Sequence, residues 1–417
     1  DDTTQNKEDM NSSHGRLLRH LSLGMLVLAL GILSSCNLGS GKFSRGDISD
    51  LNDAILVQEE PGWRYSLMGL DGKIIVEDVV SNSDDFVGCY DGIYGIKNLS
   101  GGYALYKLGE KPQKLTDAVY ESVGFAAEGI IPVQQEDGAP LVLSTKDGKP
   151  LFEVKEYEGA PVIGIGNNFY GGINCYVVEN RTSEWPQYLF GFINAKGEFL
   201  TNPIYEAVSN VTENDKVYGV LPSEGETRKV EILNNKGQVL FSSKTLTEKE
   251  LTILLGKERC VINDKIFNLK GEVVGRLPGE SVVMCIGPRD YILAREADDD
   301  VWYLLDKDGE EVTTIRNTFG VLFDTTGKNY VVAEQSNKDA VYTAYTIKEN
   351  KKVYEVSGDD LAYLKDGELL LKQGSNWFVC DAKGKEVREK YFSGIIFPKA
   401  LYGFPVLDSF ELIMNTR

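Results

Sequence analysis

Short glycine turns recur along this chain at a nearly regular interval, between runs rich in Tyr, Val, Ile, Leu and Phe. Examples are LDGK (70–73), AKGE (195–198) and KDGE (307–310). The turn glycines are Gly72, Gly148, Gly197, Gly237, Gly271, Gly309 and Gly384. Short apolar runs on either side of such a turn indicate a β-hairpin, in which glycine takes the positive φ that the turn requires.

The spacing of these glycines predicts the architecture. Successive gaps are 76, 49, 40, 34, 38 and 75 residues, and the two long gaps contain degenerate turns, LGEKP at 108–112 and KENKK at 349–352. With those turns included, eight steps separate Gly72 from Gly384, which gives nine units at a mean spacing of 39 residues. We therefore predict an all-β fold, a β-propeller-like array of about 7 to 9 four-stranded repeats of roughly 39 residues each.

Closure of such a ring needs a strand from each end of the chain. We expect residues 54–60 (AILVQEE) to pair with the last unit near 409–414 (SFELIM). Nine blades would be unusual, so an open solenoid or two smaller domains stay open as alternatives.

The unit at 190–220 carries the most informative pattern. It contains an aromatic-glycine pair, an Ile-Asn turn, and then proline, an aromatic residue, an acid and an apolar residue. These places are held by Gly191, Phe192, Ile193, Asn194, Gly197, Pro203, Tyr205, Glu206 and Val208. The unit resembles the WG repeat of bacterial proteins, closely over about 30 residues and loosely over most of 60–400. The resemblance implies a binding or structural role more than any one reaction.

Three tryptophans precede turn glycines by seven to nine residues: Trp63, Trp302 and Trp377. We interpret them as core residues between neighbouring units, with the WYLLD and WFVCD segments as buried strands. A helix is expected at 246–256 (LTEKELTILLG), where Thr247 and Glu250 can form a capping box and Gly256 can end the helix.

The amino-terminal segment has the order of a secretion signal. Arg16 and Arg19 precede a 13-residue apolar run, 21–33, which is shorter than the roughly 20 residues that span a bilayer. Leu33, Ser34, Ser35 and Cys36 then resemble the lipobox of bacterial lipoproteins. The resemblance implies that Cys36 becomes the lipidated first residue, carrying acyl chains such as palmitate. An ordinary cleaved signal with a chance cysteine is the alternative.

This reading divides the chain into three parts. Residues 1–35 are a preamble and lipoprotein signal peptide, 36–53 are the lipidated cysteine with a flexible tether, and 54–417 are the β-propeller-like repeat domain. Asn37 follows the cysteine where aspartate tends to cause inner-membrane retention in Gram-negative lipoproteins. The resemblance therefore implies an outer-membrane lipoprotein of a Bacteroidetes-type organism, on either its periplasmic or its surface face.

Composition removes several classes of function. Both histidines, His14 and His20, lie in the leader, so the mature chain has no histidine for a Ser/His or Cys/His pair or a zinc site. The net charge of −19 argues against a nucleic-acid partner, because phosphate binding needs a basic surface. Five cysteines follow Cys36 with no CxxC pairing, and we expect most to be small buried apolar residues without a structural disulfide: Cys89, Cys175, Cys260, Cys285 and Cys380.

Two apparent ligand motifs are better explained by structure. The GIGNNF segment (164–169) begins like a dinucleotide-binding loop but runs on into a strand rather than a helix. The DKDGEE segment (306–311) lacks the ligands of a calcium loop and is interpreted as a charged hairpin tip. Asp298, Asp299 and Asp300 should lie at the other end of the intervening strand, too far away to share an ion with it.

The sequence thus predicts an outer-membrane-anchored lipoprotein that is not an enzyme and has no cofactor. It would be a binding or scaffold module for an envelope protein or a glycan. It designates no catalytic, cofactor-binding or metal-ligating residue, and Cys36 is the one site residue predicted. The alternative is a carbohydrate-active enzyme with a carboxylate pair on the central face of the propeller, a chemistry that needs no histidine.

Overall fold

The computed structural model describes residues 54–59, 63–69, 71–109, 111–135, 138–180, 187–209, 215–247, 251–296, 301–324, 326–336, 339–364, 367–396 and 412–414. The leader, Cys36, the tether and the three aspartates at 298–300 lie outside the described residues. Within the described part of the chain, no helix combines the length and apolar character needed to cross a bilayer. The regular secondary structure of the described residues is almost entirely β-strand, as predicted.

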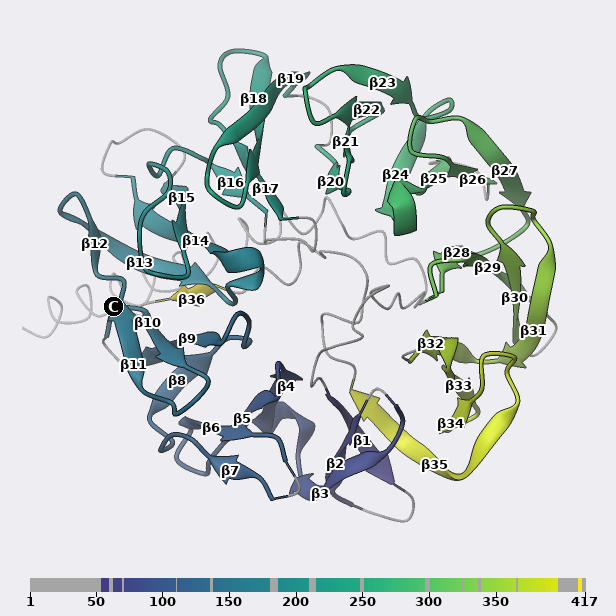
Figure 1. Ribbon diagram of the computed structural model, residues 1–417, viewed down its shortest axis with the longest axis horizontal. Helices are drawn as coiled ribbons and strands as arrows, with labels where there is room; N and C mark the ends of the chain where they lie inside the picture. The colour runs from purple at the N-terminus through teal and green to yellow at the C-terminus, as the bar shows by residue number, and fades with distance from the viewer. Residues whose placement is uncertain are drawn as a thin grey trace, which may run out of the picture.

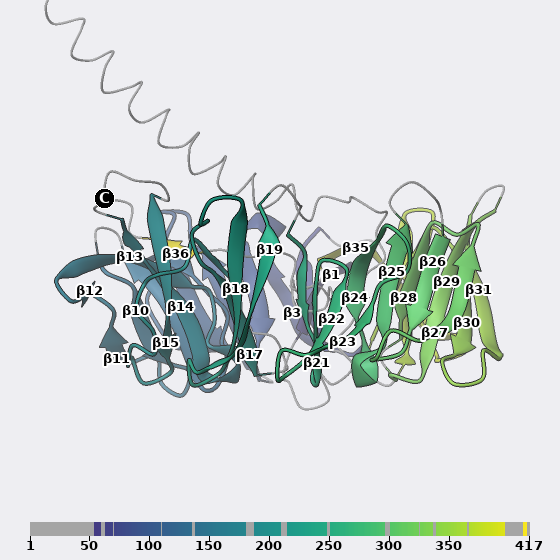
Figure 2. The same cartoon turned by 90° about the horizontal axis from the view of Figure 1, so that it is seen from above.

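The strands form a ring of four-stranded antiparallel blades (Figure 1), nine within the described residues. Figure 2 shows the ring edge-on as a flat disc. We number the blades along the chain and their strands from the centre outwards. Blade one is the end of β35 (Glu386–Ile396) with β1 (Ala54–Glu59), β2 (Tyr65–Gly69) and β3 (Ile74–Val80). Blades two and three follow as β4 (Phe86–Tyr90), β5 (Ile93–Lys97), β6 (Tyr103–Lys107) and β7 (Gln113–Lys114), then β8 (Tyr120–Val123), β9 (Ile130–Gln135), β10 (Leu141–Ser144) and β11 (Pro150–Glu153).

Blade four is less regular than the others. It consists of β13 (Ala160–Gly166), β14 (Ile173–Glu179) and β15 (Tyr188–Asn194), with a single bridge from Ile193 to Phe199 in place of a full outer strand. Two short strands extend it, β12 (Glu156–Tyr157) and β36 (Leu412–Met414), and both pair with β13. Three single 3-10 turns lie between strands of the ring: η1 (Ser83–Asp85), η2 (Tyr170–Gly172) and η3 (Pro288–Asp290).

Blades five to eight are separate four-stranded sheets. Blades five and six are β16 (Ala207–Val208), β17 (Lys216–Val220), β18 (Thr227–Asn234) and β19 (Val239–Leu246), then β20 (Ile253–Leu255), β21 (Arg259–Ile262), β22 (Lys265–Asn268) and β23 (Val273–Arg276). Blades seven and eight are β24 (Ser281–Ile286), β25 (Ile292–Glu296), β26 (Val301–Leu305) and β27 (Glu311–Arg316), then β28 (Gly320–Phe323), β29 (Asn329–Gln335), β30 (Ala340–Thr346) and β31 (Lys352–Gly358). Blade nine is β32 (Asp360–Tyr363), β33 (Leu369–Gln373), β34 (Asn376–Cys380) and the start of β35.

The predicted glycine turns all join the third strand of a blade to its fourth. The seven turn glycines have φ between 69° and 88°. At the degenerate turn after β30, Asn350 takes the left-handed conformation instead, with φ 52°. The spacing argument is therefore confirmed: each turn marks the same place in one blade.

An Asn or Asp at the end of the third strand builds five of these turns. In blade four, Asn194 Oδ1 accepts from the backbone N–H groups of Lys196 and Glu198, both at 2.9 Å. The same pair of bonds recurs in blades five, six, seven and nine at Asn234, Asn268, Asp306 and Asp381. The Asn of the repeat pattern is thus a turn-building residue, since its side chain replaces a missing backbone acceptor. At Asp306 this confirms the hairpin tip predicted for DKDGEE.

The core lies between blades. Alternate residues of a strand point to opposite faces, and here both faces are covered by a neighbouring blade. In β21, Cys260 and Ile262 pack against blade five while Val261 packs against blade seven. Eight such clusters join consecutive blades around the whole ring. This explains why the strands read as apolar runs rather than as alternating patterns.

The five cysteines belong to these interfaces. All five are buried, and none forms a disulfide within the described part of the chain, as expected for small apolar residues. Burial raises the pKa of the Cys175 thiol to about 12 and that of Cys380 to about 11, which disfavours the reactive thiolate.

Ring closure uses a different carboxy-terminal strand from the one predicted. β1 pairs with β35 through its residues Leu56, Val57 and Gln58. The prediction that the 54–60 segment closes the ring is therefore correct. The 409–414 segment was the wrong partner, since β36 pairs with β13 of blade four instead. The 11-residue β35 is long enough to be the outer strand of blade nine and then the inner strand of blade one.

Two local predictions are wrong. No helix forms over 246–256 in the described residues: β19 runs to Leu246, and Ile253–Leu255 is β20. Leu251, Ile253 and Leu255 are buried at period two, the spacing of a strand, and the Thr247 hydroxyl donates to the Glu226 carbonyl rather than capping a helix. Trp302 and Trp377 are buried as predicted, but Trp63 is 88% exposed, because it precedes β2 outside the blade interfaces.

The repeat-pattern residues of 190–220 pack within blades four and five, and several of them belong to the apolar cluster between these blades. A Cβ on Gly191 would lie 2.6–2.7 Å from three atoms of Tyr176, whose ring covers the glycine. Tyr205 covers Gly219 in the same way, and its hydroxyl donates to Glu231 Oε2 at 2.9 Å. Glycine in these strands provides space for an aromatic ring from the adjacent strand or segment.

Candidate functional site

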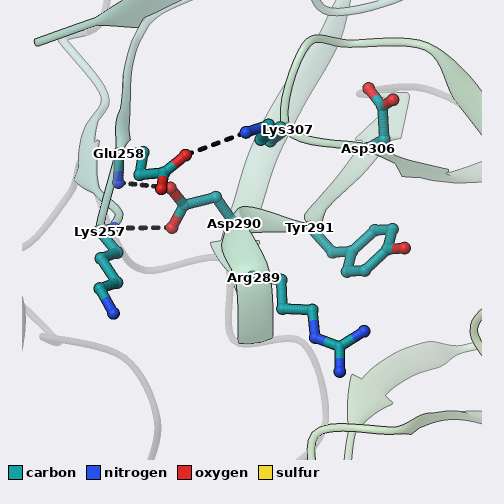
Figure 3. A pocket seen from close by; sticks show the side chains of 7 residues that line it. All are labelled: Lys257, Glu258, Arg289, Asp290, Tyr291, Asp306 and Lys307. Carbon is teal, nitrogen blue, oxygen red and sulfur yellow. Dashed lines mark hydrogen bonds and ion pairs between the residues drawn. The ribbon is translucent and has the colours of Figure 1, made fainter.

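One face of the ring carries the loops between first and second strands together with the turns between third and fourth strands. The two sets are joined by backbone hydrogen bonds within a blade, for example Thr145 N–H to Gly129 O in blade three and Ile347 N–H to Lys328 O in blade eight, both at 2.9 Å. We call this surface the turn face. On it, a pocket of about 430 Å³ opens between blades six and seven (Figure 3).

Three short segments line this pocket. They are the β20–β21 loop (Lys257 and Glu258), the β24–β25 loop (Arg289, Asp290 and Tyr291) and the β26–β27 turn (Asp306 and Lys307). Each is fixed at both ends by a blade strand, so the lining groups are held by rigid elements.

Asp290 joins the two blades at the base of the pocket. Its side chain is 3% exposed, and its two carboxylate oxygens accept the backbone N–H groups of Lys257 at 2.6 Å and Glu258 at 2.5 Å. Gly256 permits this approach, since a Cβ there would lie 2.5 Å from Asp290 Oδ1.

The loop that presents Asp290 is locally strained. Arg289 and Asp290 have φ of 56° and 60°, a left-handed conformation that costs a non-glycine residue roughly 1–2 kcal/mol. The conformation directs consecutive side chains to different places: Asp290 bonds inward to blade six, and Arg289 extends away from it (Figure 3). Backbone strain of this kind is concentrated at functional sites, where the surrounding structure maintains it.

The remaining lining groups form exposed or partly exposed pairs. Lys307 Nζ lies 2.9 Å from Glu258 Oε2 and lowers the pKa of that carboxyl. Asp306 is occupied in building its own turn. Beside the pocket, Arg259 Nη2 lies 2.7 Å from Asp308 Oδ1, a second link between blades six and seven.

A buried lysine from blade five lies in the field of the same site. Lys216 is 6% exposed, and burial lowers its pKa, while the Asp290 carboxylate partly restores it. The negative charge of Asp290 is therefore balanced both by two backbone dipoles and by a nearby cation.

No motif in the sequence indicates this site. Gly256 was assigned to the end of a helix, and nothing in GPRDY (287–291) shows that two non-glycine residues take positive φ. The one sequence-predicted site residue, Cys36, lies outside the described residues. Among the residues that the structure describes, no group of three or more His, Cys, Asp or Glu side chains is placed to hold a metal ion.

Replacing Asp290 by Asn should destabilise the ring. One N–H acceptor would become an amide donor facing a buried N–H, which costs about 1–3 kcal/mol in the free energy of unfolding. Urea denaturation followed by fluorescence measures the change. Asp306→Asn is the matched control, since Asn already builds the equivalent turn at 194, 234 and 268, and it should have wild-type stability. Equal stability of both variants would contradict the role assigned to Asp290.

Comparison with known proteins bears on the fold alone. No protein-family model matches this chain, and neither does any curated protein sequence. A solved structure described as the crystal structure of the eukaryotic initiation factor is similar, with a TM-score of 0.57 at 12% identity, covering 83% of this chain and 97% of that one. The WD40 β-propeller domain of Doa1 matches with a TM-score of 0.29 at 14% identity over 60% of this chain and 88% of that one. BamB from Moraxella catarrhalis matches with a TM-score of 0.34 at 11% identity over 71% and 94%.

Proposed function

We propose that this chain is a non-catalytic binding or scaffold module of the bacterial cell envelope, held at the outer membrane by lipid on Cys36. Its partner would be an envelope protein or a glycan. The lipobox-like sequence supports the anchor, and the rigid ring with a preformed pocket on its turn face supports binding.

One observation favours binding over hydrolysis: the carboxylates of the pocket are committed to structural partners. Asp290 accepts two backbone N–H groups, Glu258 pairs with Lys307, and Asp306 builds its turn. A glycosidase needs one carboxyl group able to donate a proton and a second able to act as nucleophile or base. The pocket is better suited to hold a ligand than to cleave one.

The anchor is tested by substitution of the cysteine. Cys36→Ala should shift the chain from the membrane pellet to the soluble envelope fraction, because the thioether that carries the acyl chains cannot form. Immunoblots of fractionated cells measure the distribution, and metabolic labelling with a palmitate analogue should mark the wild type alone. Unchanged partition of Cys36→Ala with the membrane would refute the proposed anchor.

Binding is tested on a glycan array and on purified envelope glycans, with products analysed alongside retention. Retention of a glycan without new reducing ends supports a binding module. Release of reducing ends that stops in a Glu→Gln or Asp→Asn variant of the ring would instead establish the carbohydrate-active enzyme. The absence of any retained glycan or reproducible, stoichiometric protein partner would contradict a binding role.

A further inference from the structure

Three cations and three carboxylates line the pocket between blades six and seven, and they are unequally paired. Glu258 is paired with Lys307, and Asp290 is bonded to two backbone N–H groups near Lys216. Among the described residues, neither Lys257 nor Arg289 has an ion pair or a side-chain hydrogen bond. Two cations are therefore available in a chain whose overall charge is −19.

The backbone from which the two side chains extend is fixed by contacts of Asp290. Lys257 belongs to the loop whose backbone is bonded by Asp290, and Arg289 precedes Asp290 in the strained turn. Figure 3 shows both side chains extending in the same general direction, away from the Lys307–Glu258 pair. The hydrogen bonds of Asp290 to blade six thus fix the backbone at both cations. This lowers the conformational entropy that is lost when a ligand binds.

The chemistry of the lining favours a particular kind of anion. A guanidinium matches a planar carboxylate with two parallel hydrogen bonds, and a lysine beside it adds a point charge. The ring of Tyr291, which packs partly on the core behind it, provides an apolar wall. At about 430 Å³ the pocket is within the size range of small-molecule sites.

We infer that this pocket binds a carboxylate-bearing sugar of an acidic glycan, with Arg289 holding the carboxylate, Lys257 adding a second positive charge to the site and Tyr291 facing the sugar ring. The inference rests on the proposed function and deepens it, since it selects a glycan over a protein partner and names its charged group.

The probe is glucuronate, titrated calorimetrically into the full chain in detergent, with glucose and methyl glucuronate ester as neutral counterparts and inorganic phosphate as a second anion. We expect glucuronate to bind at least about tenfold more tightly than either neutral sugar, the effect of a charge-assisted pair. Arg289→Gln should remove this preference. Lys383→Gln, an exposed lysine on the turn of blade nine, should keep it.

The outcomes separate this inference from the broader proposal. Equal affinity for glucose and glucuronate, or a preference that survives Arg289→Gln, would overturn the assigned site. If phosphate binds as tightly as glucuronate does, the assignment of a sugar ligand is wrong and the pocket is a general anion site. Retention of neutral glycans on the array without any preference for glucuronate would refute this inference alone. Failure to retain any glycan or protein would refute the proposed binding module itself.

Discussion

A chain shortened to end at Lys385 should not form a stable ring. The truncation removes all of β35, which is hydrogen-bonded to β34 on one side and to β1 on the other. Blade nine would lose its outer strand and blade one its inner strand at the same time. Size-exclusion chromatography and thermal circular dichroism should show aggregated material with no cooperative unfolding transition.

The expected loss is large because β35 covers a complete interface. The cluster between blades nine and one contains Ile55, Val57, Met68, Leu370, Trp377, Val379 and Phe392, all nearly or fully buried. Exposing a buried aliphatic or aromatic side chain costs about 1.5–3 kcal/mol. The free-energy cost of exposing only a few of these side chains therefore reaches about 5–15 kcal/mol, the typical free energy of unfolding of a whole domain.

The matched control ends at Ile396. It also removes the carboxy-terminal segment, including β36, but keeps the whole of β35. We expect this control to fold and to unfold cooperatively. If the chain ending at Lys385 melts at the same temperature as that control, closure through β35 does not stabilise the ring.

The sequence was sufficient to predict the repeating unit because the determinants of the unit are local. A glycine with positive φ, preceded at five of these turns by an Asn or Asp three residues earlier, specifies a tight turn wherever the rest of the blade lies. Gly197 with Asn194 and Gly309 with Asp306 illustrate this: the turn is complete within five residues. Repetition of one local signal then predicts an array of about 7 to 9 blades.

Features that depend on distant parts of the chain could not be predicted in the same way. Both 386–396 and 409–414 read as strands, and only the position of blade nine decides which of them meets β1. Residues 246–256 contain real helix signals, but burial of Leu251, Ile253 and Leu255 against blade five outweighs them. Trp63 has the spacing of a core residue, yet spacing alone does not place it on a strand.

The pocket was missed for a related reason. Its parts come from two blades, and they meet only because Asp290 reaches the backbone of Lys257 and Glu258, 33 and 32 residues away. Arg289 gives no sequence signal for a left-handed conformation, and at Asp290 the signal is weak, since most aspartates do not adopt it. A site created by strain across an interface becomes visible only with the fold.

Gly219→Ala is expected to destabilise blade five strongly. The added Cβ would lie 2.6 Å from Tyr205 Cγ and closer still to two other ring carbons, and Tyr205 is only 1% exposed. The ring cannot move outward without losing its hydrogen bond to the buried Glu231. Overpacking of about 1–3 kcal/mol and a broken buried hydrogen bond of similar cost should together lower the free energy of unfolding by about 3 kcal/mol or more.

Gly320→Ala on β28 is the control for methyl addition to a strand glycine, because the nearest atom to its Cβ would be Ala333 Cβ at 3.9 Å. This variant should unfold at the wild-type denaturant concentration. A second comparison identifies the ring as the cause: in a Tyr205→Leu background, Gly219→Ala should cost much less, since the two changes share one contact. Equal losses in both backgrounds would mean that Gly219 is needed for its backbone and not for the space it provides to Tyr205.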